Sequence, residues 1–320
     1  MKKRILFDPH GGHATTGCDD GRCDVASNVA AALEKNIIPS ITGHNETSGW
    51  NDYLEAMAAH GKSHYSILGT EFGYVYKDPA TKQRYKGEII CLLPAHEKLA
   101  KKMKNDVIDV WRAKKWYKKQ PLTALIEHVR HNLTQNEFDQ LVWHLPHPVT
   151  IDAVPVGKLI ARVWGKFDIL SSPEVYFPEI ACIINTIEVY NAAHPGVTNR
   201  MSVDFAKDPR FSHVGWAGAS DSHHACWLGS GATMLETMEE SAEGILNAMK
   251  KGRTIALSGM GVMSNTVLPF LMWGLTIGFA NTKVTDMIAT KTNAHQALEK
   301  FQNKTFDELL VLSKQQGWLR

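Results

Sequence analysis

The 320-residue sequence lacks several features that would define its class at once. Its five cysteines are odd in number and contain no Cys-x-x-Cys pair, which argues against a disulfide framework and favours a reduced compartment. The formal net charge is only +2, so no global field favours nucleic acid or an anionic membrane. There is no fixed-period repeat, no low-complexity tract and no Gly/Ser linker. An ordinary globular composition remains, with 44% hydrophobic and 21% charged residues.

Long hydrophobic runs are also absent. The best candidate for a membrane span, VLPFLMWGLTIGFA (Val267–Ala280), has fourteen residues and contains Pro269, whereas a bilayer core needs about twenty apolar residues. We therefore expect a buried C-terminal element there. The N-terminal stretch MKKRILFDPH has three apolar residues between its basic start and Asp8, which predicts a first strand and not a signal peptide. Together these observations predict a soluble, cytoplasmic protein with no membrane partner.

Short apolar runs that end in polar clusters recur through the first 260 residues, as in RILFD, YSILGTEFGY and HVGWAGASDSHH. Patterns typical of helices lie between them, over residues 25–35, 51–60, 156–164 and 241–251. Strands that alternate with helices predict an α/β fold with a mainly parallel sheet. When ligand-type side chains collect at successive strand ends, the expected geometry is a barrel with its site at that mouth.

Histidine and carboxylate side chains do collect at these strand ends, in the order Asp8, His10, His13, His44, Glu71, His144 or His147, Asp221 and His223. Imidazole nitrogens and carboxylate oxygens at one barrel mouth suit zinc, manganese or iron. Asp221 and His223 are one residue apart in extended chain, so their side chains point the same way. Glu71 is the candidate for a carboxylate that bridges two ions. No Gly-rich nucleotide loop, nucleophile elbow or cofactor-lysine motif competes with this interpretation.

The ordered motifs DPHGGH, ITGHN, LGTEF, HP, IEVYN and GASDSHH resemble those of the PHP (polymerase and histidinol phosphatase) family. The resemblance covers residues 4–256, about four fifths of the chain. It implies a distorted (β/α)7 TIM-like barrel over residues 1–260, with a two- or three-metal site that hydrolyses phosphoesters. Residues 261–320 are expected to form an appended helical segment that packs on the barrel or on a partner subunit, with Thr305 capping the helix FDELLVLSKQ.

Two departures from the family pattern affect histidine ligands. Gly12 stands where the family has its second histidine, so this ligand is either lost or shifted by one residue to His13. The continuation HATTGCDDG favours the shift. Gly43 replaces the family acid that orients the neighbouring imidazole, which weakens the positioning of His44 without removing that ligand.

A third departure concerns the strand GEIICLL, where Ile90 stands in place of a histidine that would bind the third ion. Cys91 or His96 are possible substitutes, and without one the third site would be weak or absent. In LVWHLPHP, His147 matches the family His-Pro pair and is expected to be the ligand, while His144 would support the pocket.

Three further residues near the motifs are left outside the predicted metal set. His194 follows the IEVYN strand and is interpreted as a loop histidine. Glu188 matches a family position that supports the strand end more than it binds metal. His224 is interpreted as a contact to solvent or substrate.

The function that the resemblance implies is metal-dependent hydrolysis of a small phosphorylated metabolite or nucleotide. Two divalent ions would be well held, with a third left open, and a hydroxide bridging them would attack phosphorus. Asp221 or His147 would then pass a proton to the leaving oxygen. Arg200 and Arg253 are candidate phosphate clamps, although ordinary surface roles are favoured for both. A degenerate, non-catalytic metal-binding module is the alternative, because three motif positions are altered.

The segment Lys98–Gln120 is locally very basic and carries interleaved aromatic residues. It predicts an amphipathic helix whose Val107, Val110 and Trp111 pack inward. The alternative is an arm that meets phosphates, which would indicate an exonuclease or phosphodiesterase acting on short nucleic acid. Nucleic acid is the less favoured partner, and the sequence does not determine the oligomeric state.

Overall fold

A computed structural model of the chain describes residues 2–13, 23–77, 82, 84–149, 180–194, 196–223, 228–258 and 304–315. The predicted helix at residues 156–164, the apolar stretch 267–280 and His224 lie outside these ranges. None of the helices in the described ranges combines the length and the apolar character needed to span a bilayer.

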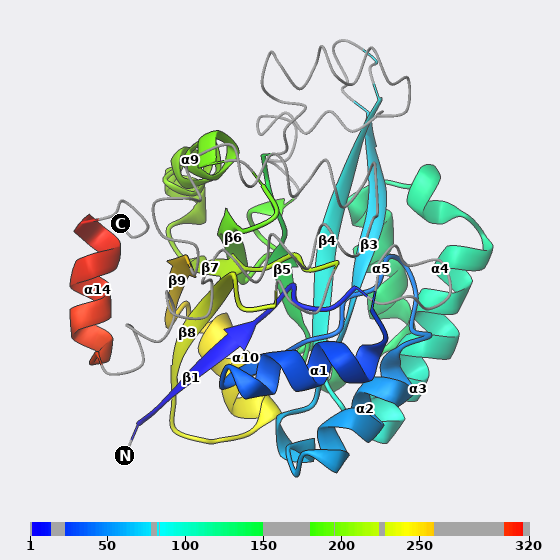
Figure 1. The fold of residues 1–320 in the computed structure, drawn as a ribbon. Coiled ribbons are helices and arrows are strands. Elements are labelled where there is room, and N and C mark those ends of the chain that lie inside the picture. The colour runs from blue at the N-terminus through cyan, green and yellow to red at the C-terminus, as the bar shows by residue number, and fades with distance from the viewer. Residues whose placement is uncertain are drawn as a thin grey trace.

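The described strands form two sheets, seen near the centre of Figure 1. The four-stranded sheet has the order β2-β1-β8-β9, with β1 (Lys3–Asp8), β2 (Ile37–Pro39), β8 (Gly231–Thr237) and β9 (Thr254–Ser258). The five-stranded sheet runs in chain order, with β3 (Ile67–Lys77), β4 (Arg84–Pro94), β5 (Val142–Leu145), β6 (Thr186–Asn191) and β7 (Gly215–Ala219).

The predicted α/β class is confirmed, but the expectation of a mainly parallel sheet was wrong. Parallel pairing joins β1 to β2, β5 to β6 and β6 to β7. The other four pairs are antiparallel, and the longest of them aligns all eleven residues of β3 with β4. The connection between β3 and β4 is too short to hold a crossover helix, so the chain returns as a hairpin.

The described strands do not form one closed ladder, in contrast to the predicted barrel. Isolated parallel bridges link the chain after β2 to β3, at Ile41–Leu68 and His44–Glu71. At the other junction, β7 packs against β8 and β9. A Cβ built on Gly218 would lie 2.7 Å from the Ala232 carbonyl oxygen, so only glycine permits this close approach. The two sheets therefore bring their strand ends together, and the closure of the barrel stays a prediction.

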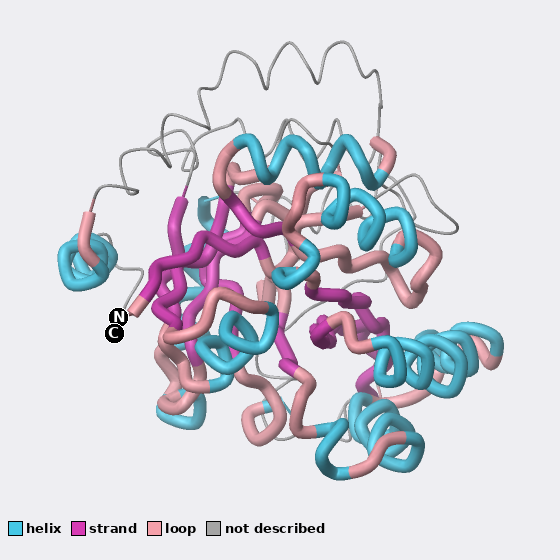
Figure 2. The backbone as a smooth tube through the Cα atoms, turned by 90° about the horizontal axis from the view of Figure 1, so that it is seen from below, coloured by secondary structure: helices cyan, strands magenta, loops and turns pink. Residues whose placement is uncertain are grey.

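Helices lie around the outside of the strands (Figure 2). They are α1 (Val25–Glu34), α2 (Trp50–Ala59), α3 (Glu97–Lys102), α4 (Asp109–Ala113), α5 (Leu122–Asn132), α6 (Gln135–Phe138), α9 (Gly196–Ala206), α10 (Ala242–Lys250) and α14 (Phe306–Gln315). Shorter helical turns are η1 (Ser63–Tyr65), η2 (Met103–Ile108), η3 (Trp116–Lys118) and η6 (Pro209–Phe211).

The predicted helices at residues 25–35, 51–60 and 241–251 are confirmed to within a residue at each end by α1, α2 and α10. Local capping explains where two of them begin. The Asp24 side chain accepts a hydrogen bond from the backbone of Ser27 at the start of α1, and Ser241 does the same from Gly244 at α10. Val25, Val29 and Ala32 then recur at helical spacing and bury one face of α1.

The basic segment is helical from Glu97 to Ala113, with the π-helical turn η2 between α3 and α4. Val107 and Trp111 are fully buried, and Val110 is half-buried. The Trp111 indole also donates a hydrogen bond of 3.2 Å to the Gly73 carbonyl, which attaches the segment to β3. The prediction of an amphipathic helix packed inward is therefore confirmed.

The predicted helix FDELLVLSKQ is α14, which lies beside β9 in Figure 1. Thr305 and Glu308 form a reciprocal capping box at its start. Leu309 is 1% exposed and packs with Leu6, Ile37 and Ile255 of the four-stranded sheet. The helix thus covers the sheet of its own chain, while the domain boundary at residue 260 stays a prediction.

Candidate metal centre

Five segments distant in sequence meet where strands end, and seven of the eight predicted metal residues gather there. Their ligand-type atoms form overlapping groups, each within 4.8 Å. The seven are His10, His13, His44, Glu71, His147, Asp221 and His223. Backbone hydrogen bonds hold two of the loops against each other, because Asp221 N donates to His10 O and His13 N donates to Ser222 O. Six of these residues follow strand ends, as predicted, but Glu71 is the fifth of the eleven residues of β3, so the prediction of a strand-end position was wrong for Glu71.

Glu71 lies at the centre of the cluster and is fully buried. Its Oε2 lies 3.0 Å from His44 Nδ1 and 3.5 Å from His10 Nε2. Its other oxygen, Oε1, lies 3.3 Å from His147 Nε2. Each oxygen thus faces a different set of imidazoles, which is the arrangement expected of a carboxylate that bridges two ions.

Asp221 faces the same imidazoles from the end of β7. Its Oδ1 lies 3.4 Å from His10 Nε2 and 3.5 Å from His13 Nε2. Asn191 donates a hydrogen bond of 3.0 Å to the other oxygen, Oδ2, and so orients the carboxylate. The backbone of Asp221 has a φ of 49°, a left-handed conformation that aspartate adopts more readily than most side chains do.

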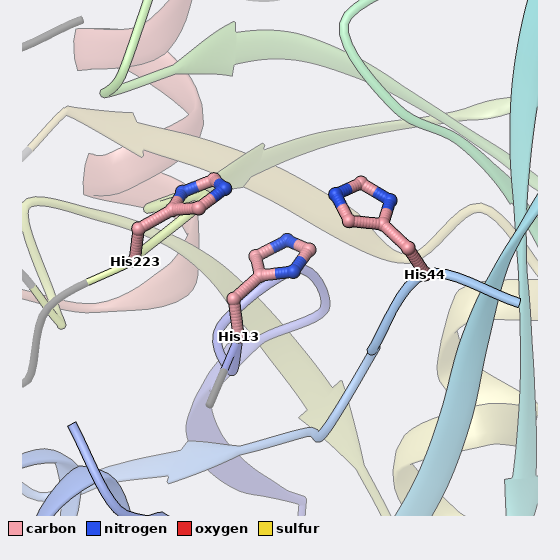
Figure 3. A group of neighbouring side chains, drawn as sticks. All are labelled: His13, His44 and His223. Atoms are coloured by element: carbon pink, nitrogen blue, oxygen red, sulfur yellow. The ribbon is translucent and has the colours of Figure 1, made fainter. Parts of the chain in front are cut away.

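Three imidazoles from three different segments converge in Figure 3. His13 stacks on His223, with ring centroids 4.3 Å apart and planes inclined by 12°. The ring of His44 lies 4.7 Å from that of His13. These three histidines form a group without a carboxylate, next to the groups that share Glu71 and Asp221.

The pKa values of the two central carboxylates, Glu71 and Asp221, are set by burial and by the neighbouring histidines. Burial raises the pKa of Glu71, but the nearby His10 and His44 outweigh it and hold the pKa well below its ordinary value. Burial also raises the pKa of Asp221, but His10 and His13 outweigh burial. The pKa of Asp221 therefore lies well below its ordinary value. Both carboxylates are therefore ionised at neutral pH and available to a cation.

The pKa values of two histidines of the site are shifted in opposite directions. Burial lowers the pKa of His147, but Glu71 and Asp221 more than compensate and raise it to about 9. His194, stacked on His147 with ring centroids 5.0 Å apart, has its pKa lowered to about 4 by burial and by the charge of His147. One of this stacked pair is thus protonated and the other neutral at pH 7.

The residues fit a metal ion by a direct test. Both Glu71 oxygens are buried and find no hydrogen-bond donor with proper geometry among the described residues. A buried ionised carboxylate without donors is costly unless a cation compensates it. Surrounding imidazole nitrogens at 3.0–3.5 Å supply the remaining ligands that zinc, manganese or iron would take.

Asp8, the eighth predicted ligand, belongs to none of these groups. Ser220 donates to both of its oxygens, from the backbone N at 3.1 Å and from the hydroxyl at 2.5 Å. Burial nevertheless raises the pKa of Asp8 to about 6. Its carboxylate thus joins the loop after β1 to the loop after β7, and its role as a metal ligand stays a prediction.

Gly12 and His13 show why the histidine lies one residue later than the family pattern predicts. A Cβ on Gly12 would lie 2.8 Å from the Ser40 carbonyl oxygen, so this position has no room for a side chain. The imidazole of His13 instead enters the cluster, with Nε2 3.2 Å from His10 Nε2. The geometry therefore favours the shifted ligand over its loss.

The two substitutes considered for the histidine missing at Ile90 do not reach the cluster. Cys91 is buried on the opposite face of β4, because neighbouring side chains of a strand alternate. The His96 side chain is 53% exposed and lies 2.6 Å from Glu243 instead. Glu88, two residues before Ile90 on the same face, does reach the cluster and groups with His44 and Glu71.

Glu188 and His144 support the site through contacts with its ligands and with neighbouring strands, as the sequence suggested. Glu188 Oε2 accepts hydrogen bonds from His147 N at 2.5 Å and from Asn191 Nδ2 at 3.0 Å, and Oε1 lies 3.5 Å from His10 Nδ1. His144 lies beneath it, with Nδ1 2.9 Å from the Thr186 hydroxyl. His147 is thus the histidine in the cluster, and His144 is the one that supports it.

Sequence reasoning missed Glu88 and His194. His194 Nε2 lies 3.8 Å from Asp221 Oδ2, and the residue groups with His147 and Asp221. It had been interpreted as a loop histidine, although its own His-Pro pair, after the IEVYN strand, was a usable signal. Glu88 lies in the same strand, GEIICLL, but the family pattern places its ligand at the position of Ile90.

Comparison with known proteins gives one sequence match. Residues 198–254 match the family model PHP_C, described as PHP-associated. No curated protein matches the chain.

Three solved structures illustrate the similarity in structure. They are a two-domain protein from Bacteroides vulgatus described as containing a predicted PHP-like metal-dependent phosphoesterase (16% identity, 84% of this chain and 70% of that chain, TM-score 0.47), PsfC from Pseudomonas syringae (13%, 85% and 97%, 0.49) and the lesion-specific endonuclease PfuEndoQ from Pyrococcus furiosus (13%, 78% and 56%, 0.44). All three TM-scores are below 0.5, so the assignment does not rest on them.

The segment that matches the family model runs from α9 through β7 and β8 to the start of β9. It includes Asp221 and His223 at the end of β7, where the SDSH motif carries the resemblance seen in the sequence. The predicted relationship to the PHP family is therefore confirmed by a family-model match over the segment that supplies these two residues to the buried cluster.

Proposed function

We propose that the protein is a metal-dependent phosphoesterase that hydrolyses a small phosphorylated metabolite or nucleotide. The observation that carries this proposal is the buried Glu71 carboxylate, which has imidazoles on both oxygens and no hydrogen-bond donor among the described residues. A structural barrel has no need of such an arrangement, since a buried carboxylate lowers stability unless its charge is compensated, and His10, the histidine that compensates Glu71 most, is itself buried.

The proposed ligand sets combine members of the neighbouring groups, which overlap at His13 and at Glu71. His10, His13, Glu71 and Asp221 would hold one ion, and His44, His223 and His147 would complete a second set with Glu71. Glu88 is an additional oxygen ligand next to His44, and whether a third ion binds is left to measurement. Bound zinc, manganese or iron would supply a Lewis acid for the phosphoryl oxygens and lower the pKa of a water ligand toward neutrality.

Two residues are proposed to handle the proton. Asp221 is ionised at neutral pH, because His10 and His13 hold its pKa low, so it can accept a proton and later return it to the leaving oxygen. His147 is a donor in its protonated form, since Glu71 raises its pKa to about 9. A histidine whose Nε2 binds an ion cannot donate from that atom, so the two assignments for His147 exclude each other, whereas Asp221 could bind the ion through Oδ1 and handle the proton at Oδ2.

The first experiment is the metal content of the purified protein by elemental mass spectrometry, paired with release of 4-nitrophenol from mono- and bis-(4-nitrophenyl) phosphate. Two or more transition-metal ions per chain with turnover are expected. A preference for the monoester would indicate a phosphatase, and a preference for the diester would favour the exonuclease or phosphodiesterase alternative. Less than one ion per chain after reconstitution with zinc, manganese and iron, without turnover, would contradict the proposal.

Replacing Asp221 by Asn separates an enzyme from a degenerate metal-binding module. An active enzyme should lose turnover by orders of magnitude and remain folded, since the amide keeps the hydrogen-bonding shape but not the charge. A fall in melting temperature with no activity to lose would favour the structural role. Asp52→Asn is a matched control, because it removes the same charge from an exposed residue outside the cluster.

A further inference from the structure

A cavity of about 320 Å³ opens beside the metal centre. Its inner side is formed by His44, Glu88 and His147, which also belong to the cluster. Lys86 and Lys118 line the same cavity. The volume lies at the lower end of the range for ligand pockets, roughly 300–1,000 Å³, and fits a small molecule.

The β3–β4 hairpin fixes the spacing along β4 between Lys86 and Glu88, which belongs to the cluster. Lys86 and Glu88 lie on the same face of β4, because alternate residues of a strand do. Two residues of extended chain span about 7 Å, which is the length of one ring-sized group. Across the hairpin Glu88 pairs with Gly73, where an added Cβ would lie 3.4 Å from Tyr117 Cβ, so the glycine lets Tyr117 pack closely on this face.

Lys118 and Tyr117 belong to the basic segment and are carried to the cavity by the turn η3. The turn is attached to β3 on both sides, since Trp111 Nε1 donates to Gly73 O at 3.2 Å and Val75 N donates to Gln120 O at 2.7 Å. The Lys118 ammonium lies 5.4 Å from the centroid of the Tyr117 ring. Both side chains are therefore placed by packed structure, although Lys118 itself is exposed.

The remaining wall is apolar and aromatic, and includes Tyr74, Leu145, Pro146 and Pro148. The Tyr74 ring lies directly over Gly87, where a Cβ would come within 2.4 Å of the ring. Such a wall favours a flat or apolar body over a highly hydrated one. The cavity thus has three chemically distinct parts, namely the metal-centre side, the apolar wall and the two lysines.

We propose that this cavity binds the non-reacting part of the substrate, and that Lys86 and Lys118 bind a second anionic group, a phosphate or carboxylate, carried about one ring length from the phosphoester. This inference rests on the proposed function and narrows its substrate class to small phosphoesters with two separated anionic groups and a flat or apolar body between them. Compact ammonium groups bind such anions as point charges.

The test uses two probes with a phosphorus–carbon bond that cannot be hydrolysed as an ester, benzylphosphonate and 4-carboxybenzylphosphonate. Binding to the manganese-loaded full chain is measured by titration calorimetry. We expect the carboxylated probe to bind at least tenfold more tightly. In the Lys86→Gln/Lys118→Gln double variant this preference should fall to less than about threefold, with benzylphosphonate affinity nearly unchanged.

The matched control is Lys104→Gln/Lys114→Gln, which removes the same charge from two exposed lysines of the basic segment that do not line the cavity. It should keep the preference. Absence of a preference in the parent protein, or its persistence in the Lys86/Lys118 variant, would overturn the inference. Turnover of 4-nitrophenyl phosphate by the same samples tests the proposed function separately. The preference without turnover would contradict the proposed function, and turnover without the preference would contradict only this inference.

Discussion

At the scale of single residues, steric contacts decide which of two neighbouring positions carries a ligand. Gly12 faces the Ser40 carbonyl oxygen so closely that even a methyl group would have to displace backbone. We therefore predict that Gly12→Ala destabilises the protein by about 1–3 kcal/mol, the usual cost of overpacking, without removing a ligand. His13→Ala should instead lower bound metal while the fold persists. Urea unfolding and metal content measure the two effects separately.

The outcome that would contradict this interpretation is the reverse pattern, in which Gly12→Ala leaves stability unchanged and His13→Ala retains full metal content. His64→Ala is a suitable control, because His64 is exposed and belongs to none of the groups of the cluster. It should change neither quantity.

Glu188 supports the metal centre without belonging to a ligand group. One of its oxygens accepts from His147 N and from Asn191 Nδ2. In Glu188→Gln the amide oxygen can keep both donors only if the amide nitrogen replaces Oε1, which lies 3.5 Å from His10 Nδ1 and would then no longer offer an acceptor to that imidazole. We expect metal affinity to fall about 10–100-fold, the usual effect of losing a group that orients ligands. Competition with a fluorescent chelator measures it, and exposed Glu34→Gln should have no effect.

Residue types and the order of the motifs were enough to predict seven members of the cluster, because few side chains bind these metals. The two that were missed have physical reasons. Glu88 faces the site because β3 and β4 form a hairpin. This pairing places Glu88 opposite Gly73, on the same face of β4 as Ile90. His194 reaches the site through a turn after β6, and no periodic pattern reports where a loop side chain points.

At the scale of elements, the pairing of α6 with the basic segment gives a pH-dependent contribution to stability. Lys102 Nζ lies 2.8 Å from both Glu137 oxygens, and Glu137 also closes the capping box with Thr134. The Lys102 ammonium and the Thr134 backbone hydrogen bond lower the pKa of Glu137 from 4.5 to about 2. Because the pKa is lower in the folded state, the contribution is present above pH 4.5 and is lost as the pH falls toward 2.

The prediction is a difference in melting temperature between the parent protein and Glu137→Gln. It should be constant between pH 5 and 7 and should shrink to nothing as the pH approaches 2, in whatever part of this range both proteins remain folded. Subtracting the two curves removes the titration of the distant metal centre, since well-separated sites add. A difference that stays constant down to the lowest accessible pH would show that the pair is not formed.

Helical elements were predicted from spacing and caps, whereas the direction of strand pairing was not. Asp24, Ser241 and Thr305 start helices through local hydrogen bonds that sequence alone can indicate. Whether β4 returns beside β3 depends on the length of the connection between them, which the alternating pattern of apolar residues does not weigh. The prediction therefore failed in topology and in placing Glu71 at a strand end, while the other predicted members of the cluster do follow strand ends.

At the scale of the whole molecule, the metal centre brings together segments that begin at residue 10 and end at residue 223, drawn from both sheets. Without an ion, the charges of Glu71 and Asp221 face histidines whose protonation is itself opposed by burial. A bound ion would therefore join the two sheets at their ends. Binding to the native state alone adds about 4 kcal/mol to stability at a free concentration 1,000 times the Kd.

We predict that removal of metal by a chelator lowers the melting temperature by several degrees and that zinc, manganese or iron restores it. The Glu71→Gln variant tests whether the ion stabilises the protein through Glu71, because the amide keeps the size of the side chain but removes the central negative charge. If the ion acts through Glu71, the variant should melt at nearly the same temperature with and without chelator, close to the metal-free parent or above it. Exposed Glu55→Gln should keep the full metal-dependent shift. A chelator effect that persists in Glu71→Gln would place the stabilising ion elsewhere, and no effect in the parent would mean that the sheets are joined by hydrogen bonds alone, such as those from Ser220 to Asp8.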